Sequence, residues 1–443
     1  MTLQPPRGTR DFLPEEMLKR EYVIAVIKTI FERYGFDPVE TPAFEYWGTL
    51  AKKGGGGDAV RDEIYFFRDK SNRELGLRFD LTVPLGRIVA SNPQIPKPFK
   101  RYQIGRVWRY DRPQAGRFRE FWQADADIVG SPVLDAEAEC LSVAVSILED
   151  LGFRDFTIRL NNRKILRGLA EIAGLSSEST PRAMRALDKL EKIGEKAVLK
   201  EMVEGGIQKK TAARLLGLVD IKGTPSSIKK GWKKAEEYTK VKEGLDELAS
   251  IMRKCRVYGI KEKAVIDFSL VRGLDYYTGP IFEITAKAKK NIGSVAGGGR
   301  YDDPVETFGG KWTPAVGISL GVERIVEIME SEGMFQLPSG RTDIFVAAVD
   351  DSVRDNAVAV CQKLRLAGIN AQTDLMKRSL KRQLEYADKM KIPYVVIVGE
   401  KELGKKRFAV KDMRRKKQAG LSLENIIKAF RKGRTLPGIK RGS

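Results

Sequence analysis

The chain has 443 residues, of which 42% are hydrophobic and 31% are charged, and these fractions exclude a disordered chain and allow two or three globular domains. Its 80 Lys and Arg residues outnumber its 59 Asp and Glu residues, and the resulting formal charge of +21 favours a polyanionic partner. The sequence contains no histidine. An imidazole base, a Ser-His-Asp or Cys-His triad and a histidine-ligated zinc site are therefore all excluded.

The N-terminal segment has charged residues at Arg7, Arg10 and Asp11 among prolines, where a signal peptide would need an apolar core. No later run is long and apolar enough for a membrane span. The three cysteines lie more than a hundred residues apart, so no Cys-x-x-Cys pair exists and buried, reduced thiols are expected. These features predict a soluble cytoplasmic protein with no membrane contact.

The first predicted element is an amphipathic helix from Glu15 to Tyr34, because apolar residues recur at helical spacing and Gly35 suits a helix C-terminus. Residues 36–44 contain two prolines, so we expect a short edge strand there. The glycine tract at 54–57 predicts a surface loop, since no Lys-Ser/Thr follows it as in a phosphate-binding loop.

Residues 99–130 predict a hairpin of two extended segments around the polar loop 111–116. Strand periodicity places two sets of side chains on one face each: Gln103, Val107 and Arg109 on the first strand, and Arg117, Arg119, Phe121, Gln123, Asp125 and Asp127 on the second. Unpaired charges are costly to bury, so this face either lines a ligand cleft or is a fully solvated outer face. The pattern does not separate these two alternatives.

The sequence between about residues 180 and 259 is rich in Lys and Glu with spaced Leu, Ile and Met, which predicts an inserted helical module. Strand-like sequence returns at 264–268 and 281–286. We therefore predict a discontinuous main domain, made of residues 1–179 and 260–335, that is interrupted by a helical module at 180–259.

Two further segments of the main domain combine arginine with glycine or tyrosine. Residues 270–283 hold Arg272 before the adjacent Tyr276 and Tyr277, although paired tyrosines on a strand more often serve packing. Residues 315–324 predict a strand that runs through two glycines into a helix carrying Arg324, and the glycines at 297–299 could let backbone approach a ligand. Arginines beside glycine-rich backbone, without imidazole, suit nucleotide chemistry, where positioning and charge neutralisation suffice.

Beyond a linker near residue 340, short apolar strands alternate with amphipathic helices, which predicts a small α/β domain at 341–443 with a largely parallel sheet. Residues 401–443 alone carry a net charge of +12. A solvated tail accounts for the last ten residues or so. The clusters at 405–407 and 414–417 flank strand-like sequence, so nucleic-acid contact is the favoured interpretation for them.

Taken together, these segments resemble the histidyl-tRNA synthetase family of class II aminoacyl-tRNA synthetases over nearly the whole chain. Residues 35–42 (GFDPVETP), 108–111 (WRYD) with their hairpin, and 317–324 (GISLGVER) resemble the three motifs of the class, the first being its dimer-interface motif. Residues 270–277 (LVRGLDYY) and 298–302 (GGRYD) are similar to peptides that mark the histidine enzyme itself.

The resemblance implies an α+β fold: an antiparallel catalytic sheet with flanking helices, a helical insertion that contacts the tRNA acceptor arm, and a C-terminal α/β anticodon-binding domain. It further implies a homodimer that uses ATP, Mg²⁺, L-histidine and tRNA. The expected activity is ATP-dependent formation of histidyl-adenylate and transfer of histidine to its tRNA.

Site roles follow from the same resemblance, residue by residue. Arg109 would contact the ATP α-phosphate, and Arg117 and Arg324 the outer phosphates. Asp80 and Thr82 would hold the ammonium group, and Gln123 would assist amino-acid binding. Asp127 and Tyr277, beside Tyr276, would bind the imidazole. Arg272, like Arg109 a catalytic residue, would neutralise carboxylate and phosphate as they react. The resemblance does not identify Mg²⁺ ligands. At positions 80 and 127 many bacterial members have glutamate, so this chain is one methylene shorter at both.

Two other functions compete with tRNA charging. The first is a regulatory subunit of ATP phosphoribosyltransferase without charging activity. Such relatives are expected to lack the charging peptides or the C-terminal domain, both of which this sequence has. The second is an RNA-binding regulator that keeps the fold without turnover, and only the retained arginines disfavour it.

Overall fold

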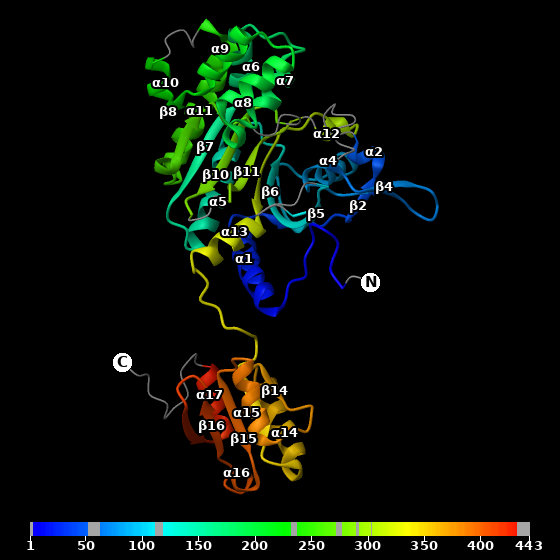
Figure 1. Cartoon of the computed structure of the whole chain (residues 1–443), viewed down its shortest axis with the longest axis vertical. Coiled ribbons are helices and arrows are strands. Elements are labelled where there is room, and N and C mark those ends of the chain that lie inside the picture. Colours follow the sequence, from blue (N-terminus) through cyan, green and yellow to red (C-terminus); the bar gives the residue numbers. More distant parts are fainter. Residues whose placement is uncertain are drawn as a thin grey trace. The chain divides into compact units, whose positions relative to one another are not determined.

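The computed structural model describes residues 3–51, 63–110, 118–231, 237–271, 277–288, 292–302 and 304–431. The chain divides into two compact units, residues 1–11 with 19–335 and residues 12–18 with 336–443 (Figure 1). The predicted glycine loop at 54–57 and the hairpin loop at 111–116 lie outside the described residues.

A nine-stranded sheet forms the centre of the first unit, in the order β1-β5-β6-β12-β11-β10-β7-β9-β8. Its strands are β1 (Asp37–Pro38), β5 (Phe99–Trp108), β6 (Glu120–Val129), β7 (Phe156–Asn162), β8 (Lys222–Gly223), β9 (Ala264–Asp267), β10 (Pro280–Ala286), β11 (Ser294–Arg300) and β12 (Ala315–Gly321). Neighbouring strands are antiparallel except at β1–β5 and β7–β9. The predicted antiparallel catalytic sheet is therefore confirmed.

The strands at 99–130, 264–268 and 281–286 occur where their periodicity predicted them. The strand expected over residues 36–44 is much shorter, because only Asp37–Pro38 pair with β5 at the edge of the sheet. Phe44 instead begins a separate three-stranded sheet, β2-β4-β3, formed by β2 (Phe44–Tyr46), β3 (Phe66–Arg68) and β4 (Glu74–Leu77).

Helices cover the sheet and share one buried apolar cluster with it. The helices of this unit are α1 (Pro14–Arg33), α2 (Trp47–Leu50), α4 (Thr82–Ser91), α5 (Asp135–Asp150), α6 (Arg163–Ala173), α7 (Thr180–Leu187), α8 (Leu190–Glu204), α9 (Lys209–Val219), α10 (Pro225–Gly231), α11 (Thr239–Val257), the 3₁₀ helix η2 (Lys261–Lys263), α12 (Pro304–Thr307) and α13 (Val322–Ser331). The first predicted helix is confirmed, and Gly35 follows it with a φ of +73°.

The segment predicted as a helical insertion forms α7 to α11, which lie with α6 at one end of the sheet (Figure 1). It also contributes the short strand β8, which pairs with β9. Val241 and Leu245 of α11 belong to the same apolar cluster as the sheet. The helices thus form part of the first compact unit, and a separate module with boundaries at 180 and 259 stays a prediction.

The second unit has a five-stranded sheet in the order β14-β13-β15-β16-β17. Its elements are β13 (Ile344–Ala348), the 3₁₀ helix η3 (Asp351–Val353), α14 (Arg354–Leu366), β14 (Ala371–Thr373), α15 (Leu380–Lys389), β15 (Tyr394–Val398), α16 (Glu400–Gly404), β16 (Phe408–Asp412), β17 (Lys417–Leu421) and α17 (Leu423–Arg431). The expected parallel pairing holds for β14, β13 and β15, whereas β16 and β17 are antiparallel.

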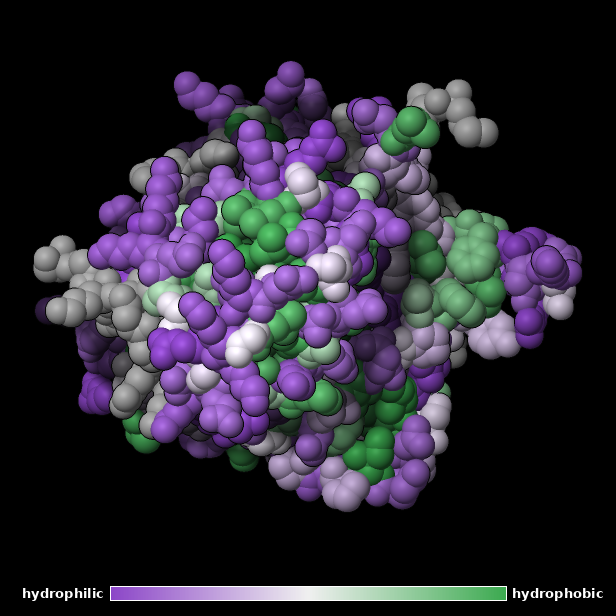
Figure 2. Space-filling model, turned by 90° about the horizontal axis from the view of Figure 1, so that it is seen from below, coloured by the Kyte–Doolittle hydropathy of each residue, from purple (hydrophilic) through white to green (hydrophobic). Residues whose placement is uncertain are grey.

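No helix within the described ranges is both long and apolar enough to span a membrane. Hydrophilic side chains cover most of the face seen in Figure 2, in keeping with the excess of Lys and Arg.

Candidate active site

The polar face predicted on the β5–β6 hairpin is buried. Gln103, Asp125 and Asp127 are only 1%, 3% and 3% exposed, and Arg109 is half-buried. The alternative of a fully solvated outer face is therefore wrong for the described part of the hairpin. Burial is tolerated because β6 lies between β5 and β12, whose side chains supply charged and hydrogen-bonding partners.

Asp127 is the last residue of this face, near the C-terminal end of β6. In the strand register it is opposite Arg101, whose Nη2 is 2.7 Å from Asp127 Oδ2, and the hydroxyl of Tyr301 donates to Asp127 Oδ1. Burial raises the pKa of Asp127, and the positive charge of Arg101 and the Tyr301 hydrogen bond oppose this rise. The side chain is thus held by groups from two other strands or their ends.

Gly317 on β12 provides the room that Asp127 occupies. A Cβ atom at position 317 would lie 2.0 Å from Asp127 Oδ1, closer than any non-bonded contact allows. At Gly298 and Gly299 a Cβ would likewise collide with backbone oxygens, those of Gly317 and Pro280. Gly298 and Gly299, two of the three glycines that the sequence suggested for close approach to a ligand, are therefore required for packing between strands.

Asp125 lies two residues earlier on the same face of β6. Burial, followed by the negative charge of Asp127, raises the pKa of Asp125 to about 7. Gln123 Nε2 donates to Asp125 Oδ1 at 3.3 Å and to Ser319 Oγ at 2.8 Å. Gln123 is thereby fixed with its amide oxygen turned toward Arg109.

Arg109 is held in place by three neighbours. Its Nη2 donates to Gln123 Oε1 at 3.0 Å, and its Nε donates to the carbonyl oxygen of Phe79 at 2.9 Å. The guanidinium carbon lies 5.2 Å from the centre of the Phe121 ring. A fixed guanidinium in a half-buried position suits binding of a phosphate oxygen.

The segment 79–82 brings a further carboxylate to this region. Asp80 is buried, and its Oδ1 accepts a hydrogen bond of 3.1 Å from the backbone N–H of Val83, near the start of α4. Thr82 is the first residue of α4 and is half-buried. Arg101 connects this segment to Asp127, since its Nη2 donates to the carbonyl oxygen of Leu81 at 3.2 Å and lies 2.7 Å from Asp127 Oδ2.

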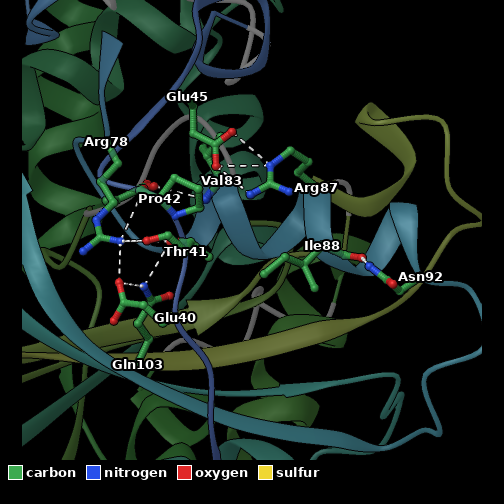
Figure 3. A network of polar contacts seen from close by, with 11 residues as sticks. Glu40, Thr41, Pro42, Glu45, Arg78, Val83, Arg87, Ile88, Asn92 and Gln103 are labelled. Carbon is green, nitrogen blue, oxygen red and sulfur yellow. Dashed lines mark hydrogen bonds and ion pairs between the residues drawn. The ribbon is translucent and has the colours of Figure 1, made fainter. Parts of the chain in front are cut away.

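A polar network around Arg78 anchors this segment. Arg78 Nη1 lies 3.0 Å from both Glu40 Oε1 and Thr41 Oγ1, and Gln103 contacts the same threonine. Figure 3 shows Glu40, Thr41 and Gln103 converging on Arg78. The segment before Asp80 is therefore tied to β5 and to the stretch that resembles the first class motif.

Of the other predicted site residues, Tyr277 and Arg324 are described. Tyr277 is half-buried and packs against the apolar cluster that contains Tyr301. Arg324 on α13 donates to the carbonyl oxygen of Ser294 at 2.8 Å. Gly321, just before α13, pairs with Gln123, so Arg324 lies near the same end of the sheet as Arg109. Arg117, Arg272 and Tyr276 lie outside the described residues.

The sequence interpretation missed three residues that organise the site, namely Arg78, Arg101 and Tyr301. Arg101 had a detectable signal, since it is two residues before Gln103 and so shares its face of the strand. Arg78 lies outside any regular strand, and no periodicity marks it.

Within the described ranges, no group of three or more acidic or cysteine residues could hold a metal ion.

The basic clusters of the second unit are exposed and connect folded elements. Lys405, Lys406 and Arg407 join α16 to β16, residues 414–416 belong to the turn between β16 and β17, and Lys417 begins β17. A frayed tail therefore does not account for them. Residues 376–379 and Arg382, before and within α15, line a further basic concavity.

Comparison with known proteins agrees with this architecture. A family described as histidyl-tRNA synthetase matches residues 8–325, and an anticodon binding domain matches residues 343–433. The histidine–tRNA ligase of Aeropyrum pernix is 42% identical over 405 residues, which cover 90% of this chain and 91% of the relative. That of Korarchaeum cryptofilum is 42% identical over 400 residues, with the same coverage of 90% and 91%.

Among solved structures, histidyl-tRNA synthetase from Nostoc sp. PCC 7120 superposes with a TM-score of 0.83 at 31% identity. The match covers 98% of this chain and 100% of that chain. The chain thus belongs to the histidyl-tRNA synthetase family.

Proposed function

We propose that this chain activates L-histidine with ATP to form histidyl-adenylate and then transfers the histidine to its tRNA. The observation that carries the proposal is the buried polar face of β5 and β6. There Arg109 and the buried Asp125 both hydrogen-bond the amide of Gln123, and a second buried carboxylate, Asp127, lies two residues farther along β6. Such a face can bind a small zwitterion beside a nucleotide phosphate.

Histidine would bind between Asp80 and Asp127. Asp80, with Thr82, would hold the ammonium group, while Asp127 would accept a hydrogen bond from the imidazole. The burial of Asp80 and Asp127 supports these roles, because charge-assisted hydrogen bonds are stronger where water is excluded. Tyr277 would complete the ring site with Tyr276, and Gln123 would assist.

ATP would bind at the end of the β5–β6 face that holds Arg109. Its α-phosphate would contact Arg109, and its outer phosphates would contact Arg117 and Arg324. A carboxylate oxygen of histidine attacks the α-phosphorus, the bond to the bridging oxygen breaks, and pyrophosphate leaves. Arg109 and Arg272 offset the negative charge that develops in this step. Mg²⁺ would enter as MgATP, since a cluster of protein ligands is lacking among the described side chains.

The second step forms the ester with tRNA. A ribose hydroxyl of tRNA attacks the carbonyl carbon of the adenylate, AMP leaves, and a phosphate oxygen of the adenylate takes the hydroxyl proton. Neither step requires an imidazole base, which is consistent with a protein that contains no histidine.

The second unit would bind the anticodon arm. Its match to an anticodon binding domain over residues 343–433 and its exposed basic clusters support this role. The same domain favours charging over a regulatory subunit of ATP phosphoribosyltransferase, for which an anticodon-binding unit has no evident use. Contact of α7 to α11 with the acceptor arm is proposed from the resemblance alone.

We also propose that the enzyme is a cytoplasmic homodimer. The segment that resembles the dimer-interface motif includes β1, which lies at the edge of the large sheet. Nearby, Phe44, Tyr46 and Phe66 on the small sheet are each about half exposed, as expected of a surface that a second copy covers. The three buried, unbridged cysteines suit a reducing compartment.

The direct test is aminoacylation. Purified protein, MgATP and radiolabelled histidine should charge a transcript of tRNA for histidine and leave a transcript for another amino acid uncharged. Folded protein that binds tRNA but charges neither transcript would instead support the RNA-binding regulator.

A further inference from the structure

Arg101 is the most deeply buried charged side chain of the site, with no exposed surface, and the roles proposed above do not use it. A single nitrogen, Nη2, makes both of its polar contacts. It lies 2.7 Å from Asp127 Oδ2 and donates to the carbonyl oxygen of Leu81 at 3.2 Å. Leu81 stands between Asp80 and Thr82 in the sequence.

Arg101 therefore connects two parts of the site that are distant in sequence. One is the segment proposed to hold the ammonium group of histidine, and the other is the carboxylate proposed to hold its imidazole ring. These are the two polar ends of the same substrate, apart from its reacting carboxylate.

The remaining hydrogen-bonding capacity of Arg101 argues against a purely stabilising role. Its Nε and Nη1 find no acceptor among the described residues, and its contact with Asp127 is an ion pair without an aligned hydrogen bond. A buried guanidinium with unsatisfied N–H groups is costly, and an apolar side chain of similar size would commonly be at least as stable. A functional constraint explains its presence better.

We propose that Arg101 is a positioning residue for amino-acid recognition: it fixes the carboxylate of Asp127 relative to the Asp80–Thr82 segment, and so sets the spacing of the two subsites to the length of histidine. This inference rests on the proposed function. Arg101 touches neither the reacting carboxylate nor ATP in this scheme. Its effect should thus appear in amino-acid affinity and not in nucleotide affinity.

Arg101→Lys tests the proposal, because lysine keeps the positive charge but lacks the planar guanidinium that places Nη2 against both partners. We expect the KM for histidine in ATP–pyrophosphate exchange to rise about tenfold or more, since misplacement by about 1 Å is enough for such losses. The KM for ATP should change less than twofold. Arg101→Met, which also removes the charge, should raise the histidine KM further, so that lysine partly rescues it.

Inhibition by histamine provides a second measurement, because histamine binds but cannot react with ATP. It has the ring and the ammonium group but no carboxylate, so it occupies only the two subsites that Arg101 connects. Its inhibition constant should rise in Arg101→Lys by the same factor as the histidine KM.

Arg20→Lys is a matched control. Arg20 is also a buried arginine, and it pairs with the carboxylate of Glu323 on α13 at 2.9 Å. Arg20→Lys should lower the melting temperature while leaving the histidine KM unchanged.

Two outcomes would overturn the inference while the proposed function stands: an unchanged histidine KM in Arg101→Lys, or equal increases in the KM values for histidine and ATP. Absence of histidine-dependent exchange in the unsubstituted protein would instead refute the proposed function. Should Arg101→Met fail to fold, Arg101→Lys with histamine still decides between the outcomes.

Discussion

Replacing Gly317 with alanine is a sharp test of how the histidine site is built. The new methyl group would lie 2.0 Å from Asp127 Oδ1, 2.7 Å from Asp127 Cγ and 3.2 Å from the carbonyl oxygen of Ala126. Non-bonded contacts of a Cβ atom essentially never fall below 3.0 Å, so the carboxylate must move by about 1 Å. That movement also disturbs its contacts with Arg101 and Tyr301.

A displacement of about 1 Å in a binding group costs roughly 10- to 100-fold in specificity, or about 1.4–2.7 kcal/mol. We therefore expect Gly317→Ala to lower kcat/KM for histidine by this factor in ATP–pyrophosphate exchange, mainly through the KM for histidine. The KM for ATP should stay within about twofold. The assay should be run well below the melting temperature of Gly317→Ala, because overpacking can also cost about 1–3 kcal/mol of stability.

Gly321→Ala on the same strand is the control. A Cβ there has its nearest neighbour, Arg324 Cδ, at 3.6 Å, which is an ordinary contact. Its histidine KM should match that of the unsubstituted protein. A normal histidine KM in folded Gly317→Ala would refute the assignment of Asp127 to the amino-acid site.

Three other predictions remain, the first two from the structure and the third from the family resemblance. First, the pKa of Asp125 is raised to about 7 in the folded protein, against about 3.9 when unfolded. Between these two values the folded state holds a proton that the unfolded state has lost, so the free energy of unfolding falls as the pH rises. Asp125→Asn should therefore raise the melting temperature more at pH 8 than at pH 5, and an equal shift at both would contradict the buried carboxyl. Second, the side chains at 414–417 can be replaced with glutamine, or with asparagine at Lys416, whose φ is +54°. This change should weaken tRNA binding and reduce the slope of log K against log salt concentration by about 0.7–0.9 per lost phosphate contact. Equal loss of exchange activity would indicate misfolding instead. Third, Arg272→Ala should abolish exchange while scarcely changing the thermal melt, and surviving activity would disprove the role of Arg272.

The main elements of the fold could be predicted because each carries its own periodicity. In β6, the polar Gln123, Asp125 and Asp127 alternate with apolar residues, and α1 buries Val23, Ile27 and Ile30 at helical spacing. The sequence of one strand does not show which other strand it pairs with. The antiparallel addition of β16 and β17 to a parallel sheet, and the separate pairing of β2 with β4, depend on contacts between segments that local sequence does not encode.

The candidate site was predictable to the extent that its residues lie on periodic strands. Gln123 and Asp127 were found through the alternation of β6. The structure joins Gln123 to Arg109 and to Asp125, and it buries Asp127 on the same face. Whether that face was buried could not be decided, because burial depends on Arg101 and Tyr301, which approach Asp127 from other strands. The pattern of one strand does not report the charges opposite it.

The central claim is that this site selects histidine and activates it with ATP. The most direct measurement is ATP–pyrophosphate exchange with each standard amino acid in turn, using the unsubstituted, folded protein. Exchange that histidine alone stimulates is the predicted result. Stimulation by a different amino acid, or no exchange with any of them, would contradict the claim.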